Sequence, residues 1–260
     1  MGIFKDRTGE IVINNEKDVA KKGWRWMEII AYRGATDIDV LIDGKYIRTG
    51  LKYGSFIDRS IKNKYHKSVC GLGYIGEGNY LAQKHGIHSV HYNTWRNMIK
   101  RCYDEKTKKK HPSYENCTIA DEWLCYQNFA AWSDENIYAV DGEKICIDKD
   151  ILFKGNKLYS ENTCIYVPLR INNLFLKGGA AKSALPIGVH ASPNKKRYSV
   201  LFNCKQLGTY DTPEEAFAVY KAAKEAYIRK VMRSYIGKIP EHHYKKLRKA
   251  LYSYEISIDD

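Results

Sequence analysis

Two acidic residues that alternate along the chain, Asp148 and Asp150, are the first candidates for chemistry, with Lys149 between them. Successive side chains of a β-strand point to opposite faces, so residues two apart share a face. Two carboxylates on one face could serve acid–base or metal-assisted reactions. The same residues could equally be the solvated tip of a hairpin, and the residues alone leave both interpretations open.

Cysteines, a histidine and glycines offer two further sites. A zinc site can be imagined from Cys102, His111, Cys117 and Cys125, but their spacing fits no common zinc pattern. The glycines of residues 70–78 suggest a phosphate-binding loop, yet they match neither the GxGxxG nor the Walker spacing. A loop that closes a small barrel is the favoured interpretation of this segment.

The composition favours a polyanionic partner. The chain holds 43 Lys and Arg against 30 Asp and Glu, which gives a net charge of +13. A merely basic, solvated surface is the alternative. No run of about 18 apolar residues that could span a membrane is present, and the N-terminus lacks the apolar core of a signal peptide. We therefore expect an intracellular chain that keeps its seven scattered cysteines reduced.

Secondary-structure elements must position these residues. The pattern of residues 9–80 is typical of β-structure. Apolar runs indicate strands at 27–32, 38–42 and 46–48, and Asp43-Gly44 supplies a hairpin turn between the last two. Arginines and lysines in this region could contact phosphates or only face solvent.

The middle of the chain is predicted to be helical. Apolar residues at helical spacing indicate helices over 92–102 and 121–132, with a basic loop at Lys106–Pro112 between them. The aromatic residues of these helices are expected in the core rather than on a base-stacking platform.

The last third changes character again. Residues 188–192, 197–202 and 205–210 are predicted to be three short strands, and a helix follows with Thr212 as N-cap and Glu215 completing a capping box. The Gly- and Ala-rich segment Leu176–Ala184 is the expected linker. A basic amphipathic helix is expected around His242–Ala250.

Three pieces of the central segment occur in a recognisable order. They are Trp95–Tyr103; Asp121-Glu122-Trp123 with Phe129 and Trp132; and Ile147-Asp148-Lys149-Asp150, followed by Gly155-Asn156, Tyr159–Cys164 and Val167-Pro168 through Asn172-Asn173. Together they resemble phage-type proteins that carry an HNH (ββα-metal) homing-endonuclease module.

This resemblance implies metal-assisted hydrolysis of phosphodiester bonds, with Mg²⁺ or another divalent ion as cofactor. Carried over position by position, Asp148 would be the metal carboxylate and Asn172 the distal metal ligand. Asn162 would be the structural asparagine that holds the hairpin in shape, and Asp150 would share the face of Asp148.

One departure from the family's pattern matters, because Lys149 stands where an active HNH enzyme has its histidine. A lysine near a phosphate normally stays protonated at neutral pH and cannot accept a proton. It could still stabilise phosphate charge, and burial could make it a base. His111 or one of the histidines at 85, 88 and 91 could serve as base instead. The sequence favours a catalytically silent DNA-binding version and leaves an active nuclease as the alternative.

The segment from Leu185 to about Met232 resembles an AP2 DNA-binding domain. The likeness rests on Gly188-Val189, Tyr198-Ser199-Val200, Leu207–Tyr210, Thr212–Ala216, Tyr220 and Ala223-Lys224. The resemblance implies a three-stranded sheet that enters the major groove of DNA while a helix packs behind it. The residues expected to meet bases and phosphates are His190, Lys195, Lys196, Arg197, Asn203 and Lys205.

The sequence therefore predicts an α+β protein in four parts. They are a β-rich N-terminal module (1–84), an HNH-like ββα domain (85–176), an AP2-like domain (185–235) and a basic C-terminal helix (236–260). The predicted function is binding of double-stranded DNA, with an active HNH nicking endonuclease as the alternative and a factor that binds protein or RNA as a third class. Target site, metal identity and oligomeric state do not follow from the residues.

Overall fold

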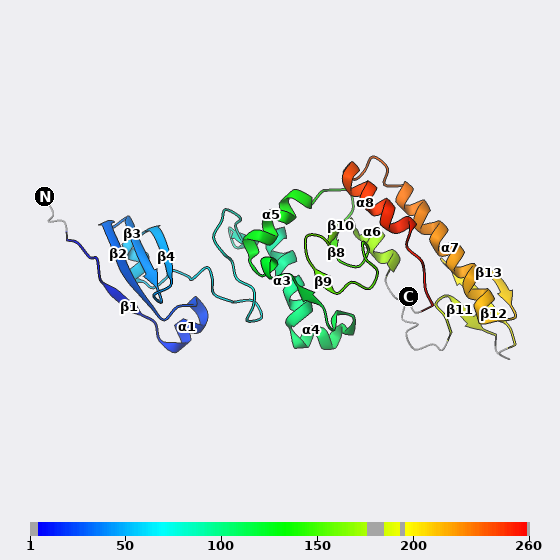
Figure 1. Cartoon of the computed structure of the whole chain (residues 1–260), viewed down its shortest axis with the longest axis horizontal. Helices are drawn as coiled ribbons and strands as arrows, with labels where there is room; N and C mark the ends of the chain where they lie inside the picture. The colour runs from blue at the N-terminus through cyan, green and yellow to red at the C-terminus, as the bar shows by residue number, and fades with distance from the viewer. Residues whose placement is uncertain (1–4, 176–184, 193–195, 259–260) are drawn as a thin grey trace. The chain divides into compact units, whose positions relative to one another are not determined.

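The computed structural model describes residues 5–175, 185–192 and 196–258. It has an α+β fold, as predicted, and its chain divides into two compact units, Met1–Ala131 and Trp132–Asp260. Figure 1 labels the elements of both units. The division falls inside helix α5 (Tyr126–Asn136) and within the range 85–176 predicted to be one HNH-like domain.

The first unit begins with an antiparallel four-stranded sheet in the order β1-β2-β3-β4. Its strands are β1 (Ile11–Ile13), β2 (Trp26–Gly34), β3 (Asp37–Ile42) and β4 (Tyr46–Leu51). Asp43 and Gly44 both have positive φ and close the predicted β3–β4 hairpin, where the Lys45 amide donates to the Ile42 carbonyl at 3.0 Å. The strand predictions for this region are confirmed.

Two helices that the sequence pattern did not indicate interrupt this β-rich region. Helix α1 (Glu16–Lys22) is capped by the side chain of Asn15, and helix α2 (Tyr53–Ile57) follows β4. The module closes over its own core, where the buried Trp24 donates its indole N–H to the Ile61 carbonyl at 2.6 Å. The other buried core residues are Met27, Ile29, Ile38, Val40, Ile42 and Phe56.

The rest of the first unit is mainly helical. It contains β5 (Gln83–Lys84), β6 (Ile87–His88), α3 (Val90–Tyr103), α4 (Glu105–Lys110), η1 (Pro112–Tyr114), β7 (Thr118–Ile119), η2 (Asp121–Leu124) and the start of α5. Helix α3 buries Trp95, Met98, Ile99 and Cys102 at the predicted spacing. The prediction of a basic loop at Lys106–Pro112 is wrong. Lysines 106–110 lie in α4, because the Asp104 side chain accepts the Thr107 amide at 2.9 Å and caps the helix.

The glycine-rich segment 70–78 packs against the chain before α5. Tyr74 exchanges backbone hydrogen bonds with Leu124 and Tyr126, at 3.0 and 2.8 Å. Gly76 has a positive φ, and a Cβ there would lie 2.4 Å from the sulfur of Cys125. Gly73, Gly76 and Gly78 thus permit close packing with neighbouring side chains, whereas a Cβ at Gly71 would meet no atom within 4 Å.

The second unit contains two antiparallel sheets and two long helices. Strand β8 (Ile145–Asp148) pairs with β10 (Ile165–Pro168), with β9 (Leu158–Tyr159) between them in sequence and α6 (Leu169–Asn172) and η3 (Asn173–Phe175) after them. Strands β11 (Val189–Ala191), β12 (Tyr198–Phe202) and β13 (Lys205–Tyr210) form the second sheet, as predicted. Most of the expected linker, residues 176–184, lies outside the described residues.

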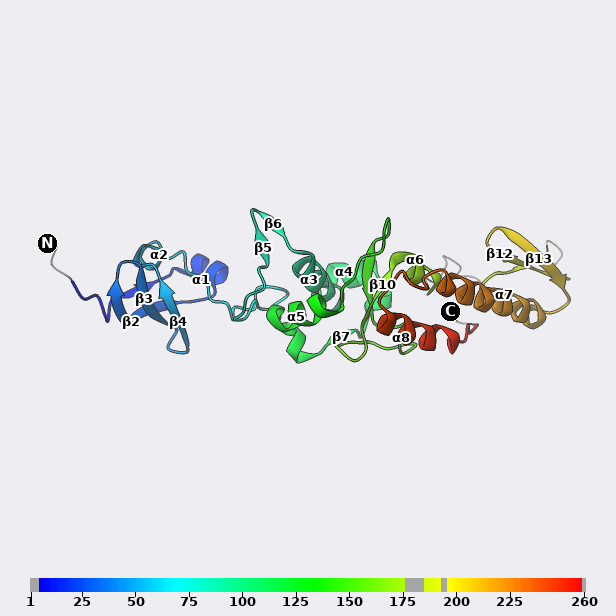
Figure 2. The ribbon, with the colours of Figure 1, turned by 90° about the horizontal axis from the view of Figure 1, so that it is seen from above.

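Helix α7 (Pro213–Arg233) covers one face of the three-stranded sheet, and α8 (Glu241–Tyr252) packs along α7 (Figure 2). The predicted N-cap is confirmed, because the Thr212 hydroxyl accepts the Glu215 amide at 3.2 Å. Gly188 lets the ring of Tyr220 lie against the backbone, where a Cβ would sit 2.1 Å from it. The predicted basic helix around His242–Ala250 lies within α8.

One core joins the β8–β10 hairpin to the sheet and the helices of the second unit. It includes Ile165 and Val167 from the hairpin, Val200 from the sheet, Ile228 from α7 and Leu247 from α8. The β8–β10 hairpin and the three-stranded sheet therefore share one hydrophobic core.

Candidate functional site

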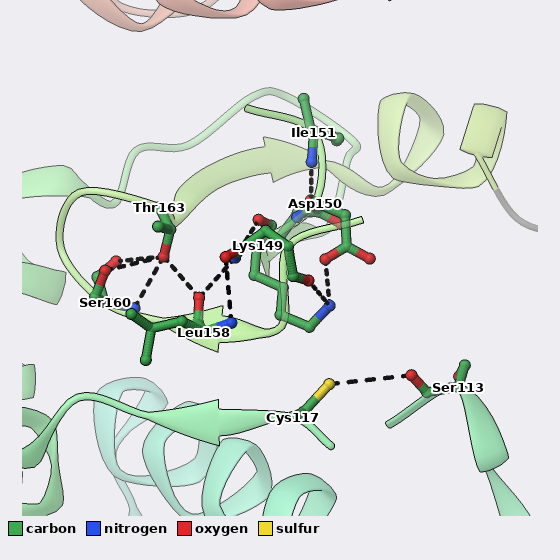
Figure 3. A network of polar contacts seen from close by, with 10 residues as sticks. Ser113, Cys117, Lys149, Asp150, Ile151, Leu158, Ser160 and Thr163 are labelled. Atoms are coloured by element: carbon green, nitrogen blue, oxygen red, sulfur yellow. Dashed lines mark hydrogen bonds and ion pairs between the residues drawn. The ribbon is translucent and has the colours of Figure 1, made fainter. Parts of the chain in front are cut away.

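Lys149 directly follows β8 and is the most deeply buried charged residue of the hairpin, with 5% of its surface exposed. Its ammonium forms an ion pair with the Asp150 carboxylate and donates to the Asn156 carbonyl at 2.8 Å (Figure 3). It also lies 5.8 Å from the centre of the Tyr159 ring. Lys149 is therefore directed into the hairpin's own loop, where it ties residue 149 to residue 156.

Asn156 completes this clamp from the other side of the loop. Its amide donates to the carbonyls of Lys149 and Leu158, at 2.9 and 2.7 Å, and its Oδ1 accepts the Leu158 amide at 3.2 Å. Gly155-Asn156 belongs to the pattern that resembles the HNH family, but no role was predicted for Asn156. Its place next to a glycine with positive φ was the available signal.

The turn that follows is held by hydroxyl groups. Thr163 Oγ1 donates to the Leu158 carbonyl at 2.7 Å, accepts the Ser160 amide at 3.1 Å and lies 2.9 Å from Ser160 Oγ. Asn162 is exposed, and its side chain makes no hydrogen bond with any described residue. In this structure the hydrogen bonds that hold the loop come from Asn156 and Thr163 and not from Asn162, the residue expected to have that role.

Asp148 is the carboxylate that the hairpin holds most firmly. Its Oδ1 accepts the amides of Asp150 and Ile151, each at 2.7 Å. Burial raises the pKa of Asp148 above its ordinary value, although the two amides act in the opposite direction. The neighbouring Cys164 is also buried, and burial raises the pKa of its thiol to about 12. A buried carboxylate with a perturbed pKa is a feature that functional sites often show.

The second predicted metal ligand, Asn172, ends helix α6, which packs against β8 and β10. Helix α6 follows the end of β10 where Pro168 pairs with Ile145. Asp148 pairs with Ile165, at the opposite end of the two-stranded sheet. Among the described residues, no three His, Cys, Asp or Glu side chains gather where they could hold a metal ion. All seven cysteines are free thiols, and the imagined zinc site from Cys102, His111, Cys117 and Cys125 is not assembled.

The three-stranded sheet turns one face toward α7 and leaves the other open. Val189 and Val200 pair across β11 and β12 and are buried against α7. The alternate residues His190, Ser199 and Thr209 pair across all three strands, so they form a single row on the outer face. His190 and Thr209 are exposed, and Ser199 is half-buried between them.

Two further polar side chains, Arg197 and Gln206, border this row. We call these five residues, His190, Arg197, Ser199, Gln206 and Thr209, the open face. Arg197 donates to the Thr209 carbonyl at 3.0 Å and pairs with Asp211, its Nε 3.2 Å from Oδ1. Gln206 donates to the Thr209 hydroxyl at 3.3 Å. The open face thus carries donors and acceptors on a rigid antiparallel scaffold.

The other residues predicted to contact DNA lie at the ends of the strands. Asn203 and Cys204 both have positive φ and form the two-residue turn between β12 and β13, a conformation that asparagine tolerates well. Lys205 follows this turn, and Lys196 precedes Arg197; both are exposed. Lys195 lies outside the described residues. Ser199, Gln206 and Thr209 were not predicted to contact DNA, because only the strand register shows which residues share a face.

No protein-family model, curated protein or solved structure matches this chain. Within the described residues, no helix is both long and apolar enough to cross a membrane.

Proposed function

We propose that the protein binds double-stranded DNA through the open face, in the manner that its resemblance to AP2 domains implies. The observation that carries this proposal is the row His190, Ser199 and Thr209, which a sheet backed by α7 leaves open. Antiparallel strands fit the major groove, where polar side chains meet the donors and acceptors of base edges. The net charge of +13 supplies attraction for phosphates. Such a protein would act in the cytoplasm of a bacterial cell.

The segment that resembles HNH is proposed to be catalytically silent. A general base needs a lone pair directed at water, whereas the Lys149 ammonium donates to Asp150 and to the Asn156 carbonyl inside the loop. The residue at the position of the catalytic histidine thus holds the loop together. The hairpin would then serve as a scaffold within the shared core of the second unit.

The described residues fit a divalent ion poorly. Asp148 already accepts two amides on one oxygen, and the Asp150 carboxylate is paired with Lys149. Mg²⁺ sites with so few protein ligands usually take their remaining ligands from bound phosphates. We therefore propose no metal-dependent step at this site.

The binding proposal is tested by fluorescence anisotropy of labelled duplex DNA at low salt. We expect the wild-type protein to bind, and the double variant His190→Ala/Thr209→Ala to bind at least about tenfold more weakly, since one lost base contact costs about 1–3 kcal/mol. Ala222→Gln, an exposed change on α7, should bind as the wild type does. Absence of binding by the wild type, or equal binding by the double variant, contradicts the proposal.

The nuclease alternative is tested by incubating a supercoiled plasmid with purified protein and Mg²⁺ or Mn²⁺. We expect no metal-dependent nicking. Nicking by the wild type that is lost in Asp148→Ala would restore the enzymatic function at this site, whereas equal nicking by both proteins would indicate a contaminant.

A further inference from the structure

The part of the chain from the middle of α7 to the end of α8 is far more basic than the rest. Residues 221–249 contain ten Lys and Arg but only two Asp and Glu, so they carry +8 of the total +13. They belong to α7, which covers the buried face of the sheet, to α8, which packs against α7, and to the connection between these helices, and not to the strands of the open face. The open face therefore does not account for most of the protein's positive charge.

Most of these cations are exposed and have no acidic partner among the described residues. This holds for Lys230, Arg233, Lys238, Lys246, Arg248 and Lys249. Two acidic residues in this part of the chain do pair with lysines: Glu225 with Lys221 at 3.8 Å and Glu241 with Lys245 at 2.7 Å. Arg248 also lies over the ring of Tyr252, 5.3 Å from its centre.

Helix α8 separates its apolar and basic residues by face. His243, Leu247 and Leu251, four residues apart, are buried in the shared core. The remaining exposed positions include Lys245, Lys246, Arg248 and Lys249 but no large apolar residue. Protein–protein interfaces concentrate aromatic and apolar anchors and are depleted in lysine, so this face suits a polyanion better than a folded protein.

Stabilisation of the helix dipoles explains only some of these charges. A cation stabilises a helix when it lies in the last turn, as Lys230 and Arg233 do in α7 and Lys249 does in α8. Lys238, Lys245, Lys246 and Arg248 lie outside those last turns, and their mutual repulsion opposes folding. Such repulsion is the expected cost of a surface that meets an anionic partner.

We propose that the basic surface, defined as Lys238, Lys245, Lys246, Arg248 and Lys249, is a second contact for duplex DNA that binds the sugar–phosphate backbone without regard to sequence. The proposal rests on the proposed function, in which the open face reads the bases. Lysine acts as a mobile point charge and suits phosphates rather than base edges. The open face would supply preference between sequences, and the basic surface would supply affinity.

The test measures duplex binding against salt concentration for the triple variant Lys246→Gln/Arg248→Gln/Lys249→Gln. Each lost phosphate contact should reduce the slope of log affinity against log salt by about 0.9, so we expect a reduction of about 2–3. Affinity at low salt should fall at least about tenfold, and the loss should be equal for two duplexes of unrelated sequence. The control Lys5→Gln/Lys17→Gln/Lys21→Gln removes the same charge from exposed positions of the first unit and should leave the slope almost unchanged.

The possible outcomes separate this inference from the proposed function. A wild-type slope in the α8 variant, or an equal loss in the control, overturns the basic surface while duplex binding itself stands. Absence of wild-type binding to any duplex overturns both. Titration with poly-glutamate tests an acidic protein partner: tighter binding of poly-glutamate than of duplex, lost in the α8 variant, also overturns the DNA assignment.

Discussion

The loop of the β8–β10 hairpin and the open face of the β11–β13 sheet are both polar, but their key side chains differ in whether they have hydrogen-bond partners within the fold. In the hairpin, Lys149, Asn156 and Thr163 bond to groups of the hairpin itself. On the open face, His190 projects from the sheet with no side-chain hydrogen bond to any described residue. Polar groups satisfied within the fold stabilise it, whereas those left open are available to a partner. The resemblances predict a functional role for both regions, catalysis for the hairpin and DNA contact for the sheet, and the hydrogen-bond pattern shows which of these side chains are already bound within the fold.

The largest effect is expected where the hairpin's clamp is removed. Lys149→Ala deletes a buried stem and leaves the Asn156 carbonyl without its donor, so the free energy of unfolding should fall by about 3 kcal/mol. Lys149→Met keeps the stem and should lose about half as much. Urea denaturation measures both, with the exposed Lys144→Ala as control. A Lys149→Ala protein that keeps wild-type stability would show that the lysine is retained for recognition.

The two asparagines of the hairpin give the next largest contrast. Asn156→Ala removes three hydrogen bonds and should cost about 2 kcal/mol of unfolding free energy. Asn162→Ala should stay within about 0.5 kcal/mol of the wild type, as exposed substitutions usually do. Thermal melts of the two variants measure this difference. A larger loss of stability in Asn162→Ala than in Asn156→Ala would assign the structural role to Asn162.

A smaller effect of opposite sign is expected at Asp148, whose buried carboxylate has a raised pKa. The fold therefore favours the protonated form, and wild-type stability should rise as the pH falls toward that pKa. Asp148→Asn keeps the Oδ1 acceptor without the charge and should stabilise the protein by about 0.5–1 kcal/mol at pH 7. The gain should shrink as the pH is lowered, which urea midpoints across the acidic range would measure. A constant difference at all pH values would show that burial does not perturb Asp148.

The sequence predicted much of the fold because local signals were strong. Asp43-Gly44, the spacing of Trp95, Met98 and Ile99, and the cap at Thr212 each act over a few residues. The helix α4 was missed because its cap is a single side chain before a run of lysines. The partners of Lys149 could not be predicted, since they depend on a loop closing seven residues later. The row on the open face depends on the register of three strands, which periodicity does not fix.

The smallest expected effect lies on the open face, at the exposed pair of Arg197 and Asp211. These side chains are 55% and 82% exposed, so their ion pair should contribute little to stability. In the free protein, however, Asp211 competes with any phosphate or base for the guanidinium. Asp211→Asn should therefore leave the melting temperature unchanged and raise affinity for duplex DNA by about two- to fivefold, the size of one weak surface ion pair. Asp141→Asn removes the same charge at another exposed position of the second unit. An equal gain in both variants would mean that net charge alone is responsible, whereas a gain confined to Asp211→Asn would place Arg197 among the groups that the open face presents to DNA.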